Sequence, residues 1–310
     1  MAQTKNVLFI GNSFTLNYSM PKKLEKIARE QGVSLYTDQA TTGGKDWNFH
    51  ATNPVTYQKI KAEPWDYVVL QAKSYEPLYP DSILEKNSIP YAQQMIDSIR
   101  FYSPDAKIML YMTWGYKNGM YLEYEEKEID YAEMQHRLSK KYIEFADQFE
   151  VAVAPVGKVW EKIRTKYPDL ELYYKDNYHQ SQLGSFLIAS TFFSMIFEST
   201  INNFSNIPYP LEEKEARAVA TIASNTVLDP ESNWRKSFWI DEDFELMDYN
   251  IYKGKITIHA NLPDSYKVKW KINGKKVSKE TAIEIPLDKK LKEVLLIARE
   301  GLLRRPRREM

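Results

Sequence analysis

At 310 residues, of which 43% are hydrophobic and 14% aromatic, the chain is long enough for one large folded domain and a smaller one. Its 42 basic and 42 acidic residues cancel, which argues against nucleic acid or an acidic membrane surface as a partner. The absence of cysteine excludes disulfides, thiolate metal sites and cysteine nucleophiles.

No apolar stretch approaches the roughly 20 residues that span a bilayer, so no membrane span is expected. The amino terminus also lacks the basic and then apolar pattern of a signal peptide. Met1-Ala2-Gln3-Thr4 fits a chain from which a signal peptide was trimmed. We therefore expect a secreted or periplasmic protein, with a cytoplasmic one as the alternative. The sequence gives no indication of the oligomeric state.

An apolar run near the amino terminus, residues 7–10, stops at Gly11 and is followed two residues later by Ser13. The run is too short for a helix and rich in β-formers, so it predicts a buried strand. A helical pattern with proline at its first position follows over residues 21–28. A hydroxyl between such a strand and helix lies at the carboxyl edge of a sheet, where α/β proteins bind ligands. Ser13 is thus a candidate nucleophile, and the alternative is that it only caps a helix.

Strand and helix patterns alternate as far as residue 227. Further strands are expected at residues 33–37, 65–71, 107–112 and 151–155, and helices at residues 89–102, 123–148, 156–167, 185–193 and 211–227. This alternation predicts a parallel sheet with helices on both faces. The Gly43-Gly44-Lys45 segment lacks the other residues of a phosphate loop, so we exclude nucleotide binding there.

The pattern changes near residue 229. Residues 255–260 and 266–272 alternate between apolar and polar side chains, and the second run ends at Asn273-Gly274, a strong hairpin signal. Further strands are expected at residues 282–286 and 294–298. Four strands without an intervening helix predict a small all-β domain, an immunoglobulin-like sandwich. We therefore expect a catalytic domain over residues 1–229 and an accessory domain over residues 230–310.

One of the four histidines can be paired with Ser13. The other three are expected on the solvated face of a helix (His136), in a loop (His50) and on the polar side of an accessory strand (His259). His179 follows Asp176 by three residues in a loop before an apolar helix. Serine becomes a useful nucleophile when an imidazole takes its proton and a carboxylate orients the imidazole. Alternatively, Asp176 caps the next helix and His179 is exposed, whereas a metal site would need further ligands at recognisable spacing.

Two segments resemble motifs of the SGNH (GDSL-type) hydrolases. Phe9-Ile10-Gly11-Asn12-Ser13-Phe14-Thr15 looks like the first block of that family, and Asp176-Asn177-Tyr178-His179 looks like its last, Asp-x-x-His. The resemblance runs from about residue 7 to residue 227. It implies a three-layer α/β/α, flavodoxin-like fold, with Ser13 as nucleophile, His179 as base and Asp176 as its partner. It implies no metal and no organic cofactor.

The chain departs from the family pattern in two blocks. Asn12 and Phe14 replace the aspartate and leucine of Gly-Asp-Ser-Leu, which leaves the serine in place. The third block, Gly-x-Asn-Asp, is missing, and Gln71 follows the third strand instead. By resemblance, the oxyanion hole would consist of the N–H groups of Ser13 and Gly44 with the side-chain amide of Gln71. The alternative is that Gln71 bridges strand ends.

The expected activity is hydrolysis of an ester through an acyl-enzyme, and the expected partner is a glycan or small-molecule ester. Four aromatic residues in loops at the expected sheet edge are candidates for binding sugar rings: Trp47, Trp114, Tyr116 and Tyr178. The resemblance therefore favours an acetylated carbohydrate. The alternatives are a small acyl or aryl ester as substrate, or a glycan-binding protein that has lost catalysis.

Overall fold

The computed structural model describes residues 3–204, 211–232 and 234, together with residues 247–252, 255–260, 266–272, 275–280, 282–286 and 294–300. The chain divides into two compact units, Met1–Phe238 and Trp239–Met310. The domain boundary predicted from the sequence, after residue 229, lies slightly before the observed one. Near the end of the first unit, the carbonyl of Trp234 accepts a hydrogen bond of 2.8 Å from Val153 of the sheet.

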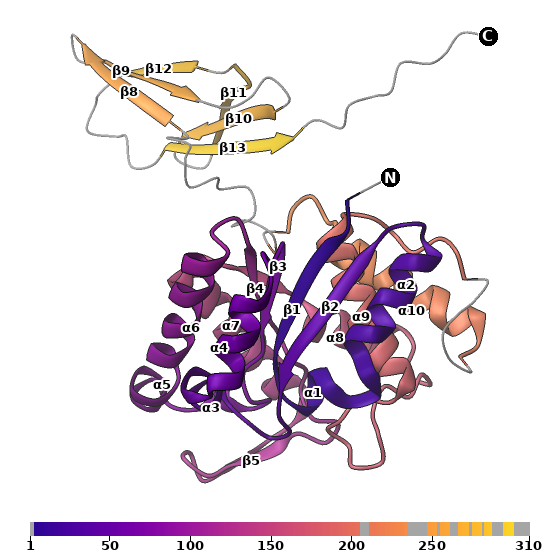
Figure 1. The fold of residues 1–310 in the computed structure, drawn as a ribbon. Coiled ribbons are helices and arrows are strands. Elements are labelled where there is room, and N and C mark those ends of the chain that lie inside the picture. Colours follow the sequence, from indigo (N-terminus) through magenta and orange to yellow (C-terminus); the bar gives the residue numbers. More distant parts are fainter. Residues whose placement is uncertain are drawn as a thin grey trace, which may run out of the picture. The chain divides into compact units, whose positions relative to one another are not determined.

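The first unit is built on a parallel sheet with the strand order β2-β1-β3-β4-β7 (Figure 1). Its strands are β1 (Lys5–Gly11), β2 (Leu35–Thr41), β3 (Tyr67–Leu70), β4 (Lys107–Tyr111) and β7 (Ala152–Ala154). Val7 pairs with Thr37 on one side and with Tyr67 on the other. The chain therefore leaves β1 in one direction to form β2 and returns across it to form β3. Ser13 follows β1 at this topological switch point, where open α/β sheets bind ligands.

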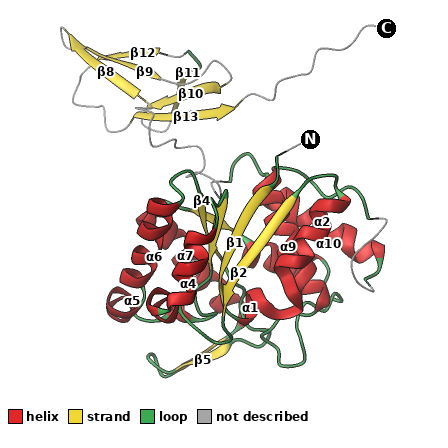
Figure 2. Cartoon of the chain, in the orientation of Figure 1, coloured by secondary structure: helices red, strands yellow, loops and turns green. Residues whose placement is uncertain are grey.

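Helices cover both faces of the sheet, as the red ribbons of Figure 2 show. One face is covered by α2 (Met20–Glu30), α8 (Val156–Lys166), α9 (Gln182–Phe197) and α10 (Glu213–Val227). The other is covered by α3 (Trp47–Thr52), α4 (Pro54–Ala62), α5 (Asp81–Asn87), α6 (Ile89–Tyr102) and α7 (Tyr131–Phe149). Because both faces of the sheet are covered, the buried parts of β1, β3, β4 and β7 are apolar runs in the sequence, whereas the edge strand β2 carries polar residues. The predicted α/β fold with a parallel central sheet is confirmed.

Residues 123–148 do not form the single helix that the sequence predicted. A short hairpin precedes the helix and consists of β5 (Met120–Leu122) and β6 (Lys127–Ile129), which pair antiparallel. The helix α7 begins only after Asp130, whose side chain accepts a hydrogen bond of 2.8 Å from the N–H of Glu133. This N-cap satisfies one of the free amides of the first turn and fixes the start of the helix.

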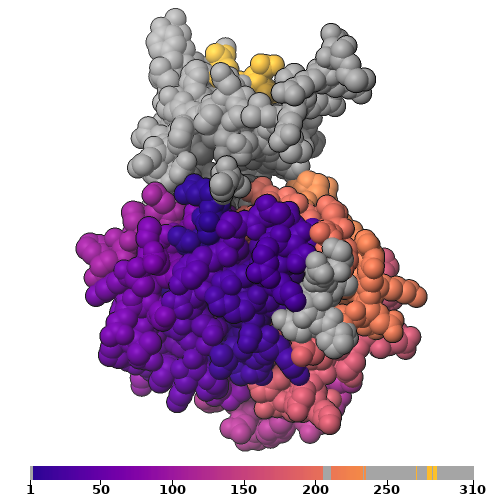
Figure 3. All heavy atoms as spheres, turned by 45° about the vertical axis from the view of Figure 1, so that its right-hand side comes forward, coloured from indigo at the N-terminus to yellow at the C-terminus, as the bar shows by residue number. Residues whose placement is uncertain are grey.

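Short elements in the loops complete the first unit. They are α1 (Ser13–Leu16) and the 3₁₀ turns η1 (Asn17–Ser19) and η2 (Glu76–Leu78). The β5–β6 hairpin and the loop around residue 175 lie at the same end of the unit as the carboxyl ends of the strands, the lower end in Figures 1 and 3. Among the described residues, none of the helices combines the length and the apolar character needed to cross a bilayer.

The second unit contains two antiparallel sheets of three described strands each. One has the order β12-β9-β8, with β12 (Ala282–Pro286), β9 (Lys255–Ala260) and β8 (Met247–Tyr252). The other has the order β11-β10-β13, with β11 (Lys275–Ser278), β10 (Tyr266–Ile272) and β13 (Val294–Glu300). The predicted turn Asn273-Gly274 and the side chain of His259 lie outside the described residues. The immunoglobulin-like sandwich stays a prediction.

Candidate active site

Ser13 is the first residue of α1, immediately beyond the end of β1. The residue that caps this helix is Asn12, whose side chain accepts a hydrogen bond of 3.2 Å from the N–H of Phe14. The Ser13 hydroxyl is therefore not needed as a cap. The turn also requires glycine at position 11, because a Cβ there would lie 2.6 Å from Oε1 of Gln71. The local structure thus presents the Ser13 hydroxyl at the sheet edge.

Ser13, His179 and Asp176 form a continuous chain of hydrogen bonds. Ser13 Oγ lies 2.8 Å from His179 Nε2, and His179 Nδ1 lies 2.8 Å from Asp176 Oδ2. A carboxylate can only accept, so Nδ1 carries the proton and Nε2 of the neutral ring is left to accept the Ser13 proton. This is the arrangement in which a serine hydroxyl is activated by a general base.

The loop before α9 holds Asp176 and His179 in this geometry. Asp176 Oδ1 accepts hydrogen bonds from the backbone N–H groups of His179, at 2.9 Å, and Tyr178, at 3.1 Å. Burial by itself would raise the pKa of Asp176, but the hydrogen bonds from the His179 ring and these N–H groups outweigh it and lower the pKa. Asp176 is therefore the ionised partner that the imidazole requires.

A neighbouring loop supports the same segment. The N–H of Lys117 donates to the carbonyl of Asn177 at 2.8 Å, and the indole N–H of Trp114 donates to the carbonyl of Tyr178 at 3.0 Å. Asn177 itself has a φ of 67°, in the left-handed region that asparagine tolerates better than most residues. The loop after β4 therefore fixes the turn that carries His179.

Gln71 is not placed as an oxyanion donor, which corrects the expectation from the resemblance. Its side chain is fully buried. Its Nε2 donates to Asn12 Oδ1 at 2.5 Å and to the carbonyl of Ala72 at 3.2 Å, which uses both hydrogens of the amide. Its Oε1 accepts from the N–H of Asn12 and from the hydroxyl of Thr15. This is the alternative interpretation, in which Gln71 bridges strand ends.

Two backbone donors are open to an oxyanion. Among the described residues, no acceptor is bonded to the N–H of Ser13 or to that of Gly44. Gly44 is exposed, with a φ of 70°, in the loop after β2. The side chain of Asn12 ties this loop to the Ser13 turn by donating to the carbonyl of Lys45 at 3.0 Å. The donors that the geometry leaves for an oxyanion are therefore main-chain groups.

Two of the four aromatic residues expected to bind substrate belong to the core instead, which is a second correction. Trp47 is fully buried at the start of α3 and packs edge-to-face on Phe145. Trp114 is also fully buried and is stacked between Phe14 and Trp160, with ring centroids 4.2 and 4.1 Å away. No ligand can reach either indole face.

The other two of the four aromatic residues, Tyr178 and Tyr116, lie near His179. The Tyr178 ring centroid is 4.3 Å from that of His179, and its side chain is 37% exposed. Tyr116 is next in line, 5.3 Å from Tyr178, with its hydroxyl 2.7 Å from Ser74 Oγ. Tyr178 is therefore an exposed candidate for contact with a substrate, and Tyr116 is half-buried behind it.

Sequence reasoning missed one supporting residue. His50 lies in α3, not in a loop, and is buried. Its Nε2 donates to the carbonyl of Gly11 at 2.8 Å, and burial lowers its pKa, which favours the neutral ring. It thus anchors the residue two positions before Ser13. The sequence signal that could have placed His50 in a helix is Asp46, which caps α3 by accepting a hydrogen bond from the N–H of Phe49.

No group of three histidine, aspartate or glutamate side chains that could hold a metal ion is found in the described part of the chain. His136 is exposed on α7, as expected.

The first unit is thus a parallel α/β unit with a serine after β1 and an Asp-x-x-His turn before α9. Residues 52–227 match the family model described as a domain of unknown function, DUF4886. Because this match covers more than half of the sequence, the chain belongs to the DUF4886 family. A comparison with curated protein sequences gives no match.

The structure is similar to that of a DUF4886 family protein from Bacteroides uniformis, with a TM-score of 0.63 and 20% identity over 74% of this chain and 97% of that one. A protein from Slackia heliotrinireducens, assigned to the SGNH hydrolases, gives a TM-score of 0.48 and 22% identity over 62% of this chain and 98% of its own. The lipase/acylhydrolase from Enterococcus faecalis gives a TM-score of 0.43 and 14% identity over 62% of this chain and 95% of its own. At these identities the similarity concerns the fold alone.

Proposed function

We propose that this protein is a serine esterase that hydrolyses its substrate through an acyl-enzyme. The observation that supports the proposal most is the chain of two hydrogen bonds of 2.8 Å from Ser13 through His179 to Asp176. Three side chains from two distant segments meet in the order that activates a hydroxyl. A structural role for Ser13 explains this geometry less well, because Asn12 already caps α1.

In the proposed reaction, Ser13 Oγ attacks the ester carbonyl while its proton moves to His179 Nε2. The ionised Asp176 stabilises the imidazolium that forms. The N–H groups of Ser13 and Gly44 stabilise the negative charge on the carbonyl oxygen. Collapse of the intermediate expels the alcohol, which takes the proton from His179. Water activated by the same base then releases the acid and restores Ser13.

We further propose that the alcohol part of the substrate is a carbohydrate and that the acyl group is acetyl. The support is the exposed face of Tyr178 next to the catalytic base, with Tyr116 behind it. Aromatic faces of this kind stack on the apolar faces of sugar rings, and their hydroxyls bond to sugar hydroxyls. A small acyl or aryl ester is the alternative, and the substrate assay below distinguishes the two.

The test compares wild type, Ser13→Ala and the control Ser82→Ala, which alters an exposed serine on α5. We expect Ser13→Ala to lower kcat/KM for p-nitrophenyl acetate by about a thousandfold or more, and the control to match wild type. A fluorophosphonate probe should label wild type and the control, but not Ser13→Ala. Equal hydrolysis by wild type and Ser13→Ala would refute the esterase and favour a glycan-binding protein without catalysis.

Substrate class is tested by comparing acetylated oligosaccharides with aryl and longer acyl esters. Release of acetate from the oligosaccharides with a higher kcat/KM than from p-nitrophenyl acetate supports the carbohydrate ester. A preference for aryl or longer acyl esters would instead support the small-ester alternative.

A further inference from the structure

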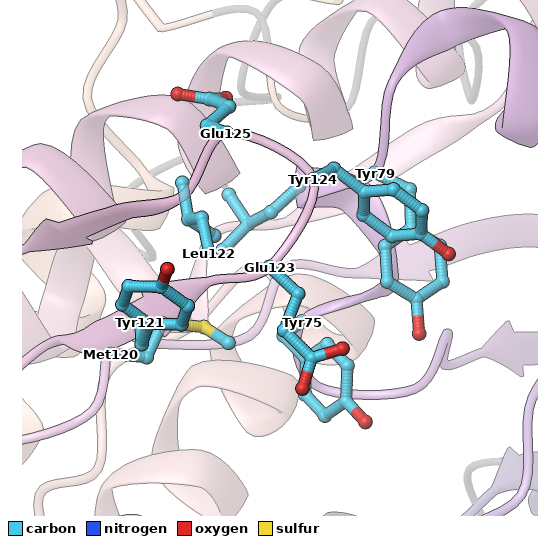
Figure 4. A pocket seen from close by; sticks show the side chains of 9 residues that line it. Tyr75, Tyr79, Met120, Tyr121, Leu122, Glu123, Tyr124 and Glu125 are labelled. Atoms are coloured by element: carbon cyan, nitrogen blue, oxygen red, sulfur yellow. The ribbon is translucent and has the colours of Figure 1, made fainter.

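A cavity of about 180 Å³ lies beside the β5–β6 hairpin, away from the triad residues themselves (Figure 4). Four tyrosines line it: Tyr75 and Tyr79 from the segment after β3, and Tyr121 and Tyr124 from the hairpin. We call it the tyrosine cavity. Met120 and Glu123 also line it, and Figure 4 shows all these side chains around one space.

The tyrosine cavity is linked to the catalytic base by a series of contacts. Tyr75 follows Ser74, whose hydroxyl is 2.7 Å from that of Tyr116. The Tyr116 ring lies 5.3 Å from Tyr178, and the Tyr178 ring lies 4.3 Å from His179. Ser74 is buried and Tyr116 is half-buried, so these contacts connect the cavity to the triad through the protein. A ligand that occupies both the triad and the cavity must therefore be extended rather than compact.

The rings of the cavity stand at right angles to one another. Tyr79 packs edge-to-face against Tyr75, at 5.8 Å and 78°, and against Tyr124, at 5.4 Å and 76°. The two tyrosines of the hairpin are exposed, Tyr121 by 51% and Tyr124 by 59%. The Tyr124 ring, which packs on Tyr79 and is yet exposed, loses little conformational freedom when a ligand covers it.

The charges at the cavity indicate a neutral ligand. The Lys73 ammonium lies 4.8 Å from the centre of the Tyr75 ring, so a cation already occupies a face of that ring. Glu125 is paired with Arg137 at 2.6 Å, which compensates its charge. The Glu123 carboxylate at the wall disfavours an anion, and an acyl chain would cover the tyrosine hydroxyls without hydrogen-bonding them. A polyol can both stack on the rings and bond to the hydroxyls.

We infer that the tyrosine cavity binds a neutral sugar ring of an oligosaccharide whose ester is cleaved at Ser13. This inference rests on the proposed function, because it assigns the leaving group of the same reaction. The cavity then selects for substrates that are longer than one sugar unit.

The catalytic test uses Tyr124→Ala and the control Phe101→Ala, which removes a ring that is 77% exposed at the end of α6. The measured quantity is the ratio of kcat/KM for acetylated xylo-oligosaccharides to that for p-nitrophenyl acetate, which cannot fill the cavity. We expect Tyr124→Ala to lower this ratio about tenfold, and the control to leave it unchanged. An unchanged ratio in Tyr124→Ala would overturn the inference while leaving the esterase intact.

A binding test separates the inference from catalysis. Isothermal titration of Ser13→Ala with unacetylated xylo-, manno- and chito-oligosaccharides needs no turnover. If one of these glycans binds, and adding Tyr124→Ala weakens the binding about tenfold, the cavity is supported as a sugar site even if no ester is hydrolysed. Absence of binding by every glycan of the panel overturns it, as does binding of choline with the same sensitivity to Tyr124→Ala.

Discussion

The variant Asp176→Asn tests the triad most directly, because the structure dictates how the new amide must lie. Asp176 Oδ1 accepts from two backbone N–H groups, those of His179 and Tyr178. An asparagine will keep its oxygen on these donors, so its NH₂ group must face His179 Nδ1. The ring is then protonated at Nε2 and cannot accept the Ser13 proton. We expect kcat/KM for p-nitrophenyl acetate to fall about 10⁴-fold.

Asp176→Ala provides the matched comparison. It removes all three hydrogen bonds of the Asp176 carboxylate, of which the charge-assisted one to the His179 ring bears on the reaction. That bond is worth about 1.5–3 kcal/mol, which corresponds to a loss of about 10- to 150-fold. Because the Asp176 side chain is 29% exposed, water can replace it and the ring can still adopt the productive tautomer. The assay measures initial rates at pH 8, with Ser13→Ala as the baseline and thermal unfolding as the check on folding. An asparagine variant more active than the alanine variant would refute the reasoning.

Three further variants test the surroundings of the site. Gln71→Ala should lower the free energy of unfolding in urea by about 2–4 kcal/mol, because it leaves buried donors such as the Asn12 N–H unpaired; unchanged stability with a lower kcat would contradict our placement of Gln71. Burial, opposed by hydrogen bonds, raises the pKa of Glu76 from 4.5 to about 7. The folded state therefore binds that proton more tightly, and stability falls as the pH rises from about 4.5 to about 7. Relative to wild type, Glu76→Gln should gain about 3 kcal/mol between pH 4 and pH 8 in urea unfolding, and a constant difference would contradict this. Trp114→Phe keeps the ring stack but loses the hydrogen bond to the Tyr178 carbonyl, so kcat should fall about tenfold. A loss of stability with unchanged kcat would show that this hydrogen bond does not position His179.

The inner strands of the central sheet were predictable because they are buried on both faces. Runs such as residues 7–10 and 67–70 have no charged or amide side chain, and they end at Gly11 and at the polar Gln71. The β5–β6 hairpin was not predictable in the same way, because its strands are only three residues long and too short to show an alternating pattern. The helix predicted from residue 123 therefore began too early, because it included part of the hairpin before the N-cap at Asp130.

The residues of the candidate site also differ in how far the sequence indicated their positions. The contact between Ser13, His179 and Asp176 could be expected, because the prediction depended only on residue type and order along the chain. The positions of Trp47 and Trp114 depend on which way a loop turns after a strand or before a helix. A tryptophan near a sheet edge can cover a ligand or fill the core, and only tertiary packing decides between them. The role of Gln71 likewise depends on Asn12 and Thr15, which lie in the turn and short helix that follow β1.

The contact between Ser13 and His179 joins residues that are 166 positions apart. Closing so long a loop is a late and entropically expensive event for a folding chain. Partly folded forms, in which β1 has paired with its neighbours but α9 has not docked, contain the serine without its base. Recovery of ester hydrolysis during refolding will therefore report the docking of the second half of the unit. It will lag behind the signals that report helix content alone.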